Sequence, residues 1–108
     1  MRPILTGGLT MYAAVTMVKM KPGHYDDMHA IATSAPNSLR AHKGFISAVY
    51  YSDKEKDEYG ATTVWETKED YEAFWNSVAS QATEQYGPMM REPAVMNGYL
   101  VNSYFTPG

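Results

Sequence analysis

The chain has no cysteine among its 108 residues, which excludes disulfide bonds and thiolate chemistry. Runs of lysine and arginine are also missing, and the formal net charge of −3 argues against a nucleic-acid partner. No apolar stretch is long enough to span a membrane or to form a signal peptide, so we expect a cytoplasmic protein that does not associate with membranes. Phosphate-binding loops, dinucleotide glycine patterns and catalytic triads are absent. Any activity must therefore draw its reactivity from the substrate, and we expect no metal, flavin or heme.

What the sequence does contain is typical of a single globular domain. Hydrophobic residues make up 44% of the chain and charged residues 19%, which is far from the composition of a disordered protein. At this length the chain can build one core but not two. We expect residues 1–10 to form a flexible N-terminal segment and residues 11–108 to form the domain.

Hydrophobic periodicity and breaker residues predict four strands and two helices. The first helix begins near His24 and should be kinked or restarted at Pro36, because an interior proline disrupts a regular helix. Thr67 and Asp70 resemble a capping box at the start of the second helix, which should stop at Gly87. The predicted strands cover residues 11–20, 45–51, 59–66 and 99–105, with a charged loop at 52–58 and an irregular segment at 89–97.

This β-α-β-β-α-β order predicts an α+β domain with the ferredoxin-like arrangement. Two helices can cover only one face of a four-stranded sheet, yet both faces of the predicted strands carry apolar residues. A second copy of the chain is the simplest cover for the other face. We therefore expect a homodimer.

Aromatic residues flank the junction between the third predicted strand and the second helix. Trp65 ends the strand and Tyr71 begins the buried stripe of the helix, so both should converge on the space between sheet and helix. They could be hydrogen-bond donors to a small aromatic molecule, or core aromatics whose polar ends find backbone partners. Phe74 and Trp75 would add aromatic lining, and Met89 could serve as an adaptable wall or as plain core filling.

Three histidines, His24, His29 and His42, could suggest a metal site, but their spacing argues against one. Helical ligands of a single metal lie three or four residues apart, whereas His24 and His29 are five apart. Surface or capping roles are the better interpretation. His29 flanks the apolar stripe of the first helix and is the one candidate for a proton acceptor.

The segments Gly44-Phe-Ile-Ser-Ala-Val-Tyr50 and Trp65-Glu-Thr-Lys-Glu69 resemble the antibiotic biosynthesis monooxygenase family. The resemblance covers roughly residues 11–105 and implies a dimeric α+β barrel built from ferredoxin-like protomers. The best-understood branch oxidises polyketide phenols to quinones with molecular oxygen and without a cofactor. Its pocket residues imply that Trp65, Tyr71 and Tyr50 line the site, whereas the Asn of that branch falls at Ala61.

The wider superfamily also contains heme-degrading enzymes, isomerases and decarboxylases, so the resemblance specifies fold better than chemistry. The heme-ligating His of the heme-degrading branch falls near Glu84, which offers no obvious ligand. We therefore expect a cofactor-independent monooxygenase acting on a small aromatic or enolic metabolite. The alternatives are a dimeric small-molecule-binding protein without catalysis, and an isomerase or decarboxylase that would use His29.

Overall fold

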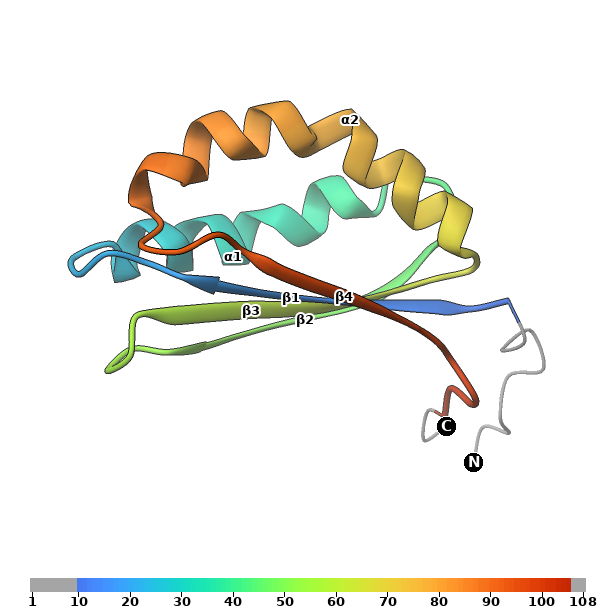
Figure 1. Ribbon diagram of the computed structural model, residues 1–108. Coiled ribbons are helices and arrows are strands. Elements are labelled where there is room, and N and C mark those ends of the chain that lie inside the picture. Colours follow the sequence, from blue (N-terminus) through green and yellow to red (C-terminus); the bar gives the residue numbers. More distant parts are fainter. Residues whose placement is uncertain (1–9, 106–108) are drawn as a thin grey trace.

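The computed structural model describes residues 10–105, apart from the side chains of residues 32 and 34–37. Its elements follow the predicted β-α-β-β-α-β order, so the α+β, ferredoxin-like prediction is confirmed. The sheet is antiparallel throughout, with strand order β2-β3-β1-β4, and both helices lie on one of its faces (Figure 1). The elements are β1 (Tyr12–Lys19), α1 (Tyr25–Leu39), β2 (Phe45–Asp53), β3 (Glu58–Trp65), α2 (Lys68–Tyr86), a short 3₁₀ turn η2 (Gly87–Met89) and β4 (Val95–Leu100).

The turn from β3 into α2 is fixed by local hydrogen bonds. Thr67 has extended backbone angles and its side chain accepts a hydrogen bond from the backbone N–H of Asp70 at 3.0 Å, which confirms the predicted cap. One residue earlier, the N–H of Glu66 donates to the carbonyl of Gly44 at 2.8 Å. Gly44 has φ +81°, and a Cβ there would collide with the Asp70 side chain. The start of β2 and the start of α2 are thereby held together.

The first helix and the last strand both differ from the prediction. α1 continues as one helix through Pro36 to Leu39, so the fresh helix that was one alternative at Pro36 does not form, and the kink stays a prediction. Only three helical residues follow the proline, so the missing N–H affects little more than the last turn. The last strand is β4 at Val95–Leu100 rather than residues 99–105, because pairing with β1 selects the segment.

Strand register assigns each side chain to a face of the sheet. Trp65 pairs with Tyr12 of β1, and Ala61 pairs with Tyr50 of β2, so all four side chains face the helices. A bulge between Phe45 and Ser47 brings Phe45 to this face as well, opposite Trp65, whereas strict alternation would place it on the same face as Val49 and Tyr51. The structure thus places a row of aromatic residues under the helices.

The other face of the sheet has no helix over it (Figure 1). Four apolar side chains of its edge strands are exposed, by 60% for Val49, 39% for Tyr51, 56% for Val95 and 57% for Tyr99. We call this surface the open face. Tyr51 leans across the sheet there and its hydroxyl contacts the Thr62 hydroxyl at 2.9 Å.

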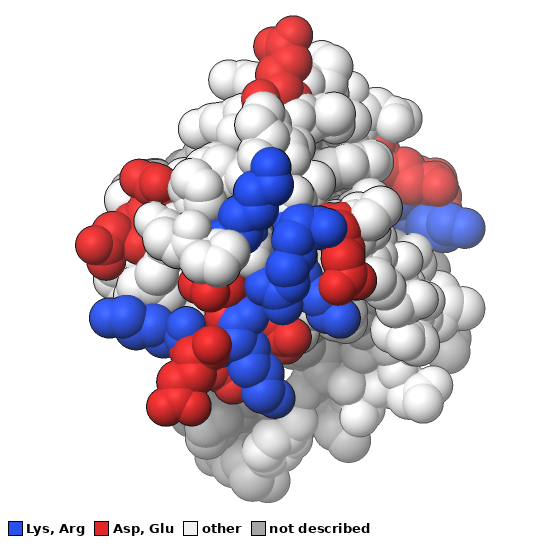
Figure 2. Space-filling view, turned by 60° about the vertical axis from the view of Figure 1, so that its left-hand side comes forward, with Lys and Arg blue, Asp and Glu red and all other residues white. Residues whose placement is uncertain are grey.

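Charged side chains gather at the end of the sheet that carries the β2–β3 hairpin, where Figure 2 shows acidic and basic residues interleaved. Arg91 contacts three parts of the chain at this end. Its guanidinium donates to the carbonyl of Met20 at 2.6 Å and to the carbonyl of Lys56 at 3.1 Å, and it lies 3.9 Å from the carboxylate of Glu58. One side chain therefore ties the end of β1, the hairpin and the segment before β4 together.

Candidate functional site

Five aromatic side chains meet where β3 runs into α2. The indole of Trp65 stacks on Phe74 with 5.1 Å between ring centroids, and lies 6.0 Å from the Tyr71 ring and 5.5 Å from the Phe45 ring. Tyr12 joins from β1, with its ring 5.7 Å from that of Tyr71. We call these residues the Trp65 cluster. Trp65 and Tyr71 converge, as the sequence predicted.

The indole of Trp65 is fully buried, at 0% exposure, in the floor of the cluster. Its N–H donates to the hydroxyl of Thr63 at 2.9 Å, two residues earlier on the same face of β3. This bond satisfies the one donor that the side chain has. Trp65 therefore supplies a rigid aromatic surface against which Tyr71 and Phe74 are positioned.

Tyr71 occupies the outer part of the cluster and is half-buried. Its hydroxyl donates to the thioether sulfur of Met96 on β4 at 4.0 Å, a weak acceptor. Burial raises the pKa of the Tyr71 phenol above 10.0, and the negative charge that Tyr12 would carry raises it further. Tyr71 is therefore a neutral O–H donor at neutral pH, with a partner that a better acceptor could replace.

Among the described residues, the other predicted lining residues apart from Phe74 make no ring contact with Trp65. Tyr50 faces the helices opposite Ala61, which is four residues before Trp65 on β3. Burial raises the pKa of Tyr50, and the nearby Tyr86 raises it further. Trp75 is half-buried on α2, and Met89 lies in η2, where its carbonyl accepts from the Lys21 N–H at 2.7 Å. Within the described part of the chain, Phe74 is the one of the four predicted substrate-binding residues whose ring stacks on Trp65.

His29 lies in a separate group of rings toward the other end of β3. Its imidazole stacks on Tyr25 at 5.9 Å, and Tyr25 in turn lies 5.8 Å from Tyr59. Tyr59 is six residues before Trp65 along β3, which corresponds to about 20 Å of strand. The structure therefore does not bring His29 together with Trp65 and Tyr71.

Sequence reasoning passed over two members of the Trp65 cluster, Tyr12 and Phe45, and one residue that contacts it, His42. His42 is half-buried and its ring meets Phe74 edge-on at 4.9 Å, whereas the sequence favoured a surface or capping role for it. Tyr12 lies within the predicted strand at residues 11–20 and was not among the predicted site residues. Its register opposite Trp65 was the missing signal, and register depends on pairing across the sheet.

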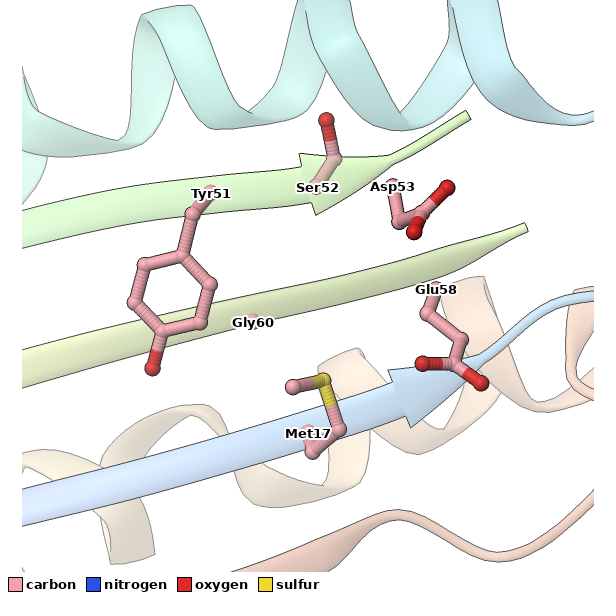
Figure 3. Close-up of a pocket in the computed structure, with 6 residues that line it drawn as sticks. All are labelled: Met17, Tyr51, Ser52, Asp53, Glu58 and Gly60. Carbon is pink, nitrogen blue, oxygen red and sulfur yellow. The ribbon is translucent and has the colours of Figure 1, made fainter. Parts of the chain in front are cut away.

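A separate hollow of about 170 Å³ lies on the sheet near the hairpin (Figure 3). The Tyr51 ring lies over Gly60, which has no side chain, and Met17 of β1 also lines the hollow (Figure 3). Its rim carries the carboxylates of Asp53 and Glu58. Asp53 already accepts the N–H groups of Glu55 and Lys56, at 3.1 and 3.3 Å, so its carboxylate serves the turn.

Within residues 10–105, side chains of the types that bind metals do not form a group of three or more at any point. Across the same part of the chain, neither helix has the length and apolarity needed to cross a bilayer.

Comparison with known proteins identifies a family and a fold. The sequence model described as antibiotic biosynthesis monooxygenase matches residues 11–86. No curated protein matches the chain. A protein of unknown function from Nitrosomonas europaea has a similar structure, with a TM-score of 0.79, 15% identity, and coverage of 94% of this chain and 98% of that one.

Two further solved structures have the same fold at low identity. A protein from Mycobacterium tuberculosis gives a TM-score of 0.72 at 14% identity, covering 83% of this chain and 93% of the other. A mutant of SnoaB from Streptomyces nogalater, a cofactor-independent oxygenase, gives 0.71 at 11% identity, covering 91% and 99%. At these identities the likeness establishes the fold alone.

Proposed function

Because the chain belongs to the antibiotic biosynthesis monooxygenase family, we propose that it oxidises a small aromatic or enolic metabolite with molecular oxygen and without a cofactor. The observation that carries the proposal is the Tyr71 hydroxyl, held at the edge of the Trp65 cluster by a weak thioether acceptor. A cofactor-independent oxygenase shares this fold, so the fold is compatible with the same reaction class.

The chemistry requires few protein groups. An electron-rich phenol or enol loses a proton, and the resulting anion transfers one electron to O₂, giving a substrate radical and superoxide. These combine into a C–O bond, and the peroxide takes up a proton. Loss of water, which removes the remaining C–H hydrogen and breaks the O–O bond, leaves a carbonyl. An anthrone plus O₂ thus gives an anthraquinone plus water, with the substrate oxidised and one oxygen atom reduced to water.

In this proposal Tyr71 donates to the substrate oxyanion, because its raised pKa keeps the phenol protonated. Trp65 and Phe74 form the aromatic wall that fixes Tyr71, and a planar substrate would stack beside them. Tyr50, Trp75 and Met89 are proposed to contact the more distant part of the substrate.

We also propose that the protein is a cytoplasmic homodimer whose two open faces pack together. The exposed Val49, Val95 and Tyr99 side chains support this arrangement, since monomers rarely leave a broad apolar sheet face in water. Two-fold packing would bury the same surface on both copies.

The isomerase or decarboxylase alternative needs a residue that transfers protons, and His29 is its candidate. It is less well supported because His29 stacks on Tyr25 and lies apart from the Trp65 cluster. A binding protein without catalysis would use the same Trp65 cluster, and the experiment below separates it from an oxygenase.

The test is oxygen uptake with a panel of dihydroxynaphthalenes and anthrones. The proposal expects uptake with at least one compound, and a fall of about 100-fold in kcat/KM for Tyr71→Phe, the loss typical of one oxyanion donor. Trp65→Phe should also lower oxygen uptake, because the Tyr71 ring loses the indole surface against which it packs. The matched control is Tyr99→Phe, a tyrosine on the open face.

Equal uptake in the wild-type protein, Tyr71→Phe and Trp65→Phe would show that the chemistry lies elsewhere. Tight binding without oxygen uptake across the panel would establish the binding protein instead. Thermal unfolding of each variant checks that the lost activity does not come from lost folding.

A further inference from the structure

The helix layer stops short of β4. On the face of the sheet that bears the helices, β4 presents Met96, Gly98 and Leu100, which pair with Thr16, Ala14 and Tyr12. Met96 is nevertheless 43% exposed and Leu100 is 67% exposed. α2 makes its sheet contacts mainly with β1 and β3. An apolar strip of β4 therefore lies open beside the Trp65 cluster.

Two phenol hydroxyls reach this strip from different elements. Tyr71 comes from α2, and its hydroxyl meets the Met96 sulfur. Tyr12 comes from β1 and lies across Gly98, whose missing side chain makes the room: a Cβ on Gly98 would occupy the position of the Tyr12 hydroxyl. Within the described part of the chain, the hydrogen bonds of the structure give the Tyr12 hydroxyl no protein partner.

The indole N–H of Trp65 is not available in the same way. It is buried and bonded to Thr63 at 2.9 Å, and a ligand could reach it only by breaking that bond and displacing neighbouring rings. The two donors that face the β4 strip are both tyrosine hydroxyls.

We propose that Tyr12 is the second hydrogen-bond donor, with Tyr71, to the oxygen of a phenolate or enolate that lies over the β4 strip, and that Gly98 is the residue that admits it. This inference rests on the proposed function, because it names the group that would share the oxyanion with Tyr71. The ligand class is a flat monoanion: the donors supply two O–H groups, and Met96 and Leu100 supply an apolar floor. Hydrogen bonds from such donors become stronger as negative charge develops on the ligand oxygen.

The experiment uses para-nitrophenol as the probe, because its phenolate absorbs visible light and it is not oxidised by O₂. Dissociation constants are measured by absorbance titration on either side of the pKa of the free probe, which gives the preference of the site for phenolate over neutral phenol. The wild-type protein should prefer the phenolate. Tyr12→Phe should weaken phenolate binding by about 10-fold to 100-fold and leave neutral phenol binding nearly unchanged.

Two further variants sharpen the result. Gly98→Ala keeps both tyrosines but fills the space of the Tyr12 hydroxyl, so it should reproduce the loss seen in Tyr12→Phe. Tyr99→Phe changes the neighbouring residue on the opposite face of the same strand and should leave the preference unaltered. A merely structural role of Tyr12 would weaken both forms of the probe together.

The inference is overturned if the wild-type protein shows no phenolate preference, or if Tyr12→Phe retains it. Failure of the proposed function gives a different pattern. Oxygen uptake would be absent across the substrate panel while the phenolate preference still depends on Tyr12 and Tyr71.

Discussion

Replacing Val49 with Asp is expected to separate the proposed dimer into monomers. The Val49 side chain is 60% exposed on the open face, and full burial of a valine stabilises by roughly 1.5–3 kcal/mol. Burying the exposed part of the Val49 side chain against the partner subunit therefore stabilises the dimer by about 1–2 kcal/mol per copy. Two-fold symmetry counts the residue twice, so the interface loses about 2–4 kcal/mol before any cost of burying the carboxylate.

That loss corresponds to a dissociation constant raised about 30-fold to 700-fold, since each 1.4 kcal/mol is a factor of ten. Sedimentation velocity over a dilution series measures the change directly. Leu100→Asp is the matched control, because Leu100 has a similar exposure, 67%, but belongs to the face that bears the helices. A wild-type protein that sediments as a monomer at micromolar concentration, or a Val49→Asp protein that dimerises as well as wild type, would refute the reasoning.

Three further predictions concern stability. Gly44→Ala should lower the free energy of unfolding by about 1–3 kcal/mol, which is more than the loss expected for Gly23→Ala. Both glycines have positive φ, but only Gly44 faces a neighbouring side chain, that of Asp70. Paired urea titrations measure the difference. Thr67→Ala should cost about 1 kcal/mol through loss of the helix cap, with Thr67→Ser restoring most of it in thermal unfolding. Stability should also fall as the pH rises above 10.0, which the urea midpoint measures from about pH 9 to 11. Folding raises the pKa of four phenols, those of Tyr50, Tyr59, Tyr71 and Tyr86. The folded state therefore favours the protonated phenols, and this advantage is lost as they deprotonate at high pH. A urea midpoint that stays constant or rises over this range would contradict the pKa directions.

Local signals in the sequence were enough to predict the order of elements and the β3–α2 junction. The Thr67 cap and the spacing of Trp65 and Tyr71 depend only on residues close together in the sequence. The convergence of the Trp65 and Tyr71 rings could therefore be predicted. β4 was misplaced because every one of its residues is exposed and Gly98 interrupts its pattern. Its position is decided by pairing with β1, which no local pattern records.

The difference between local signals and pairing across the sheet also explains which parts of the candidate site could be predicted. His29 lies within α1 and His42 lies three residues beyond its end, and periodicity alone could not tell which of them reaches the Trp65 cluster. The contact of the His42 ring with Phe74 decides for His42. The bulge after Phe45 shifts one aromatic ring to the other face of β2, an effect that strict alternation cannot anticipate. Tyr12 was missed because its neighbours come from β3, α2 and β4 together.

The strand order also has a consequence for the way the chain emerges during synthesis. β1 is made first, yet it lies in the interior of the sheet and both of its neighbours, β3 and β4, are made later. One edge of β1 stays unpaired until β3 is complete, and the other until residues 95–100 follow. An unpaired apolar strand is a template for association with other chains. In the folded chain the Arg91 guanidinium bonds the carbonyl of Met20, and so joins the segment before β4 to the end of β1.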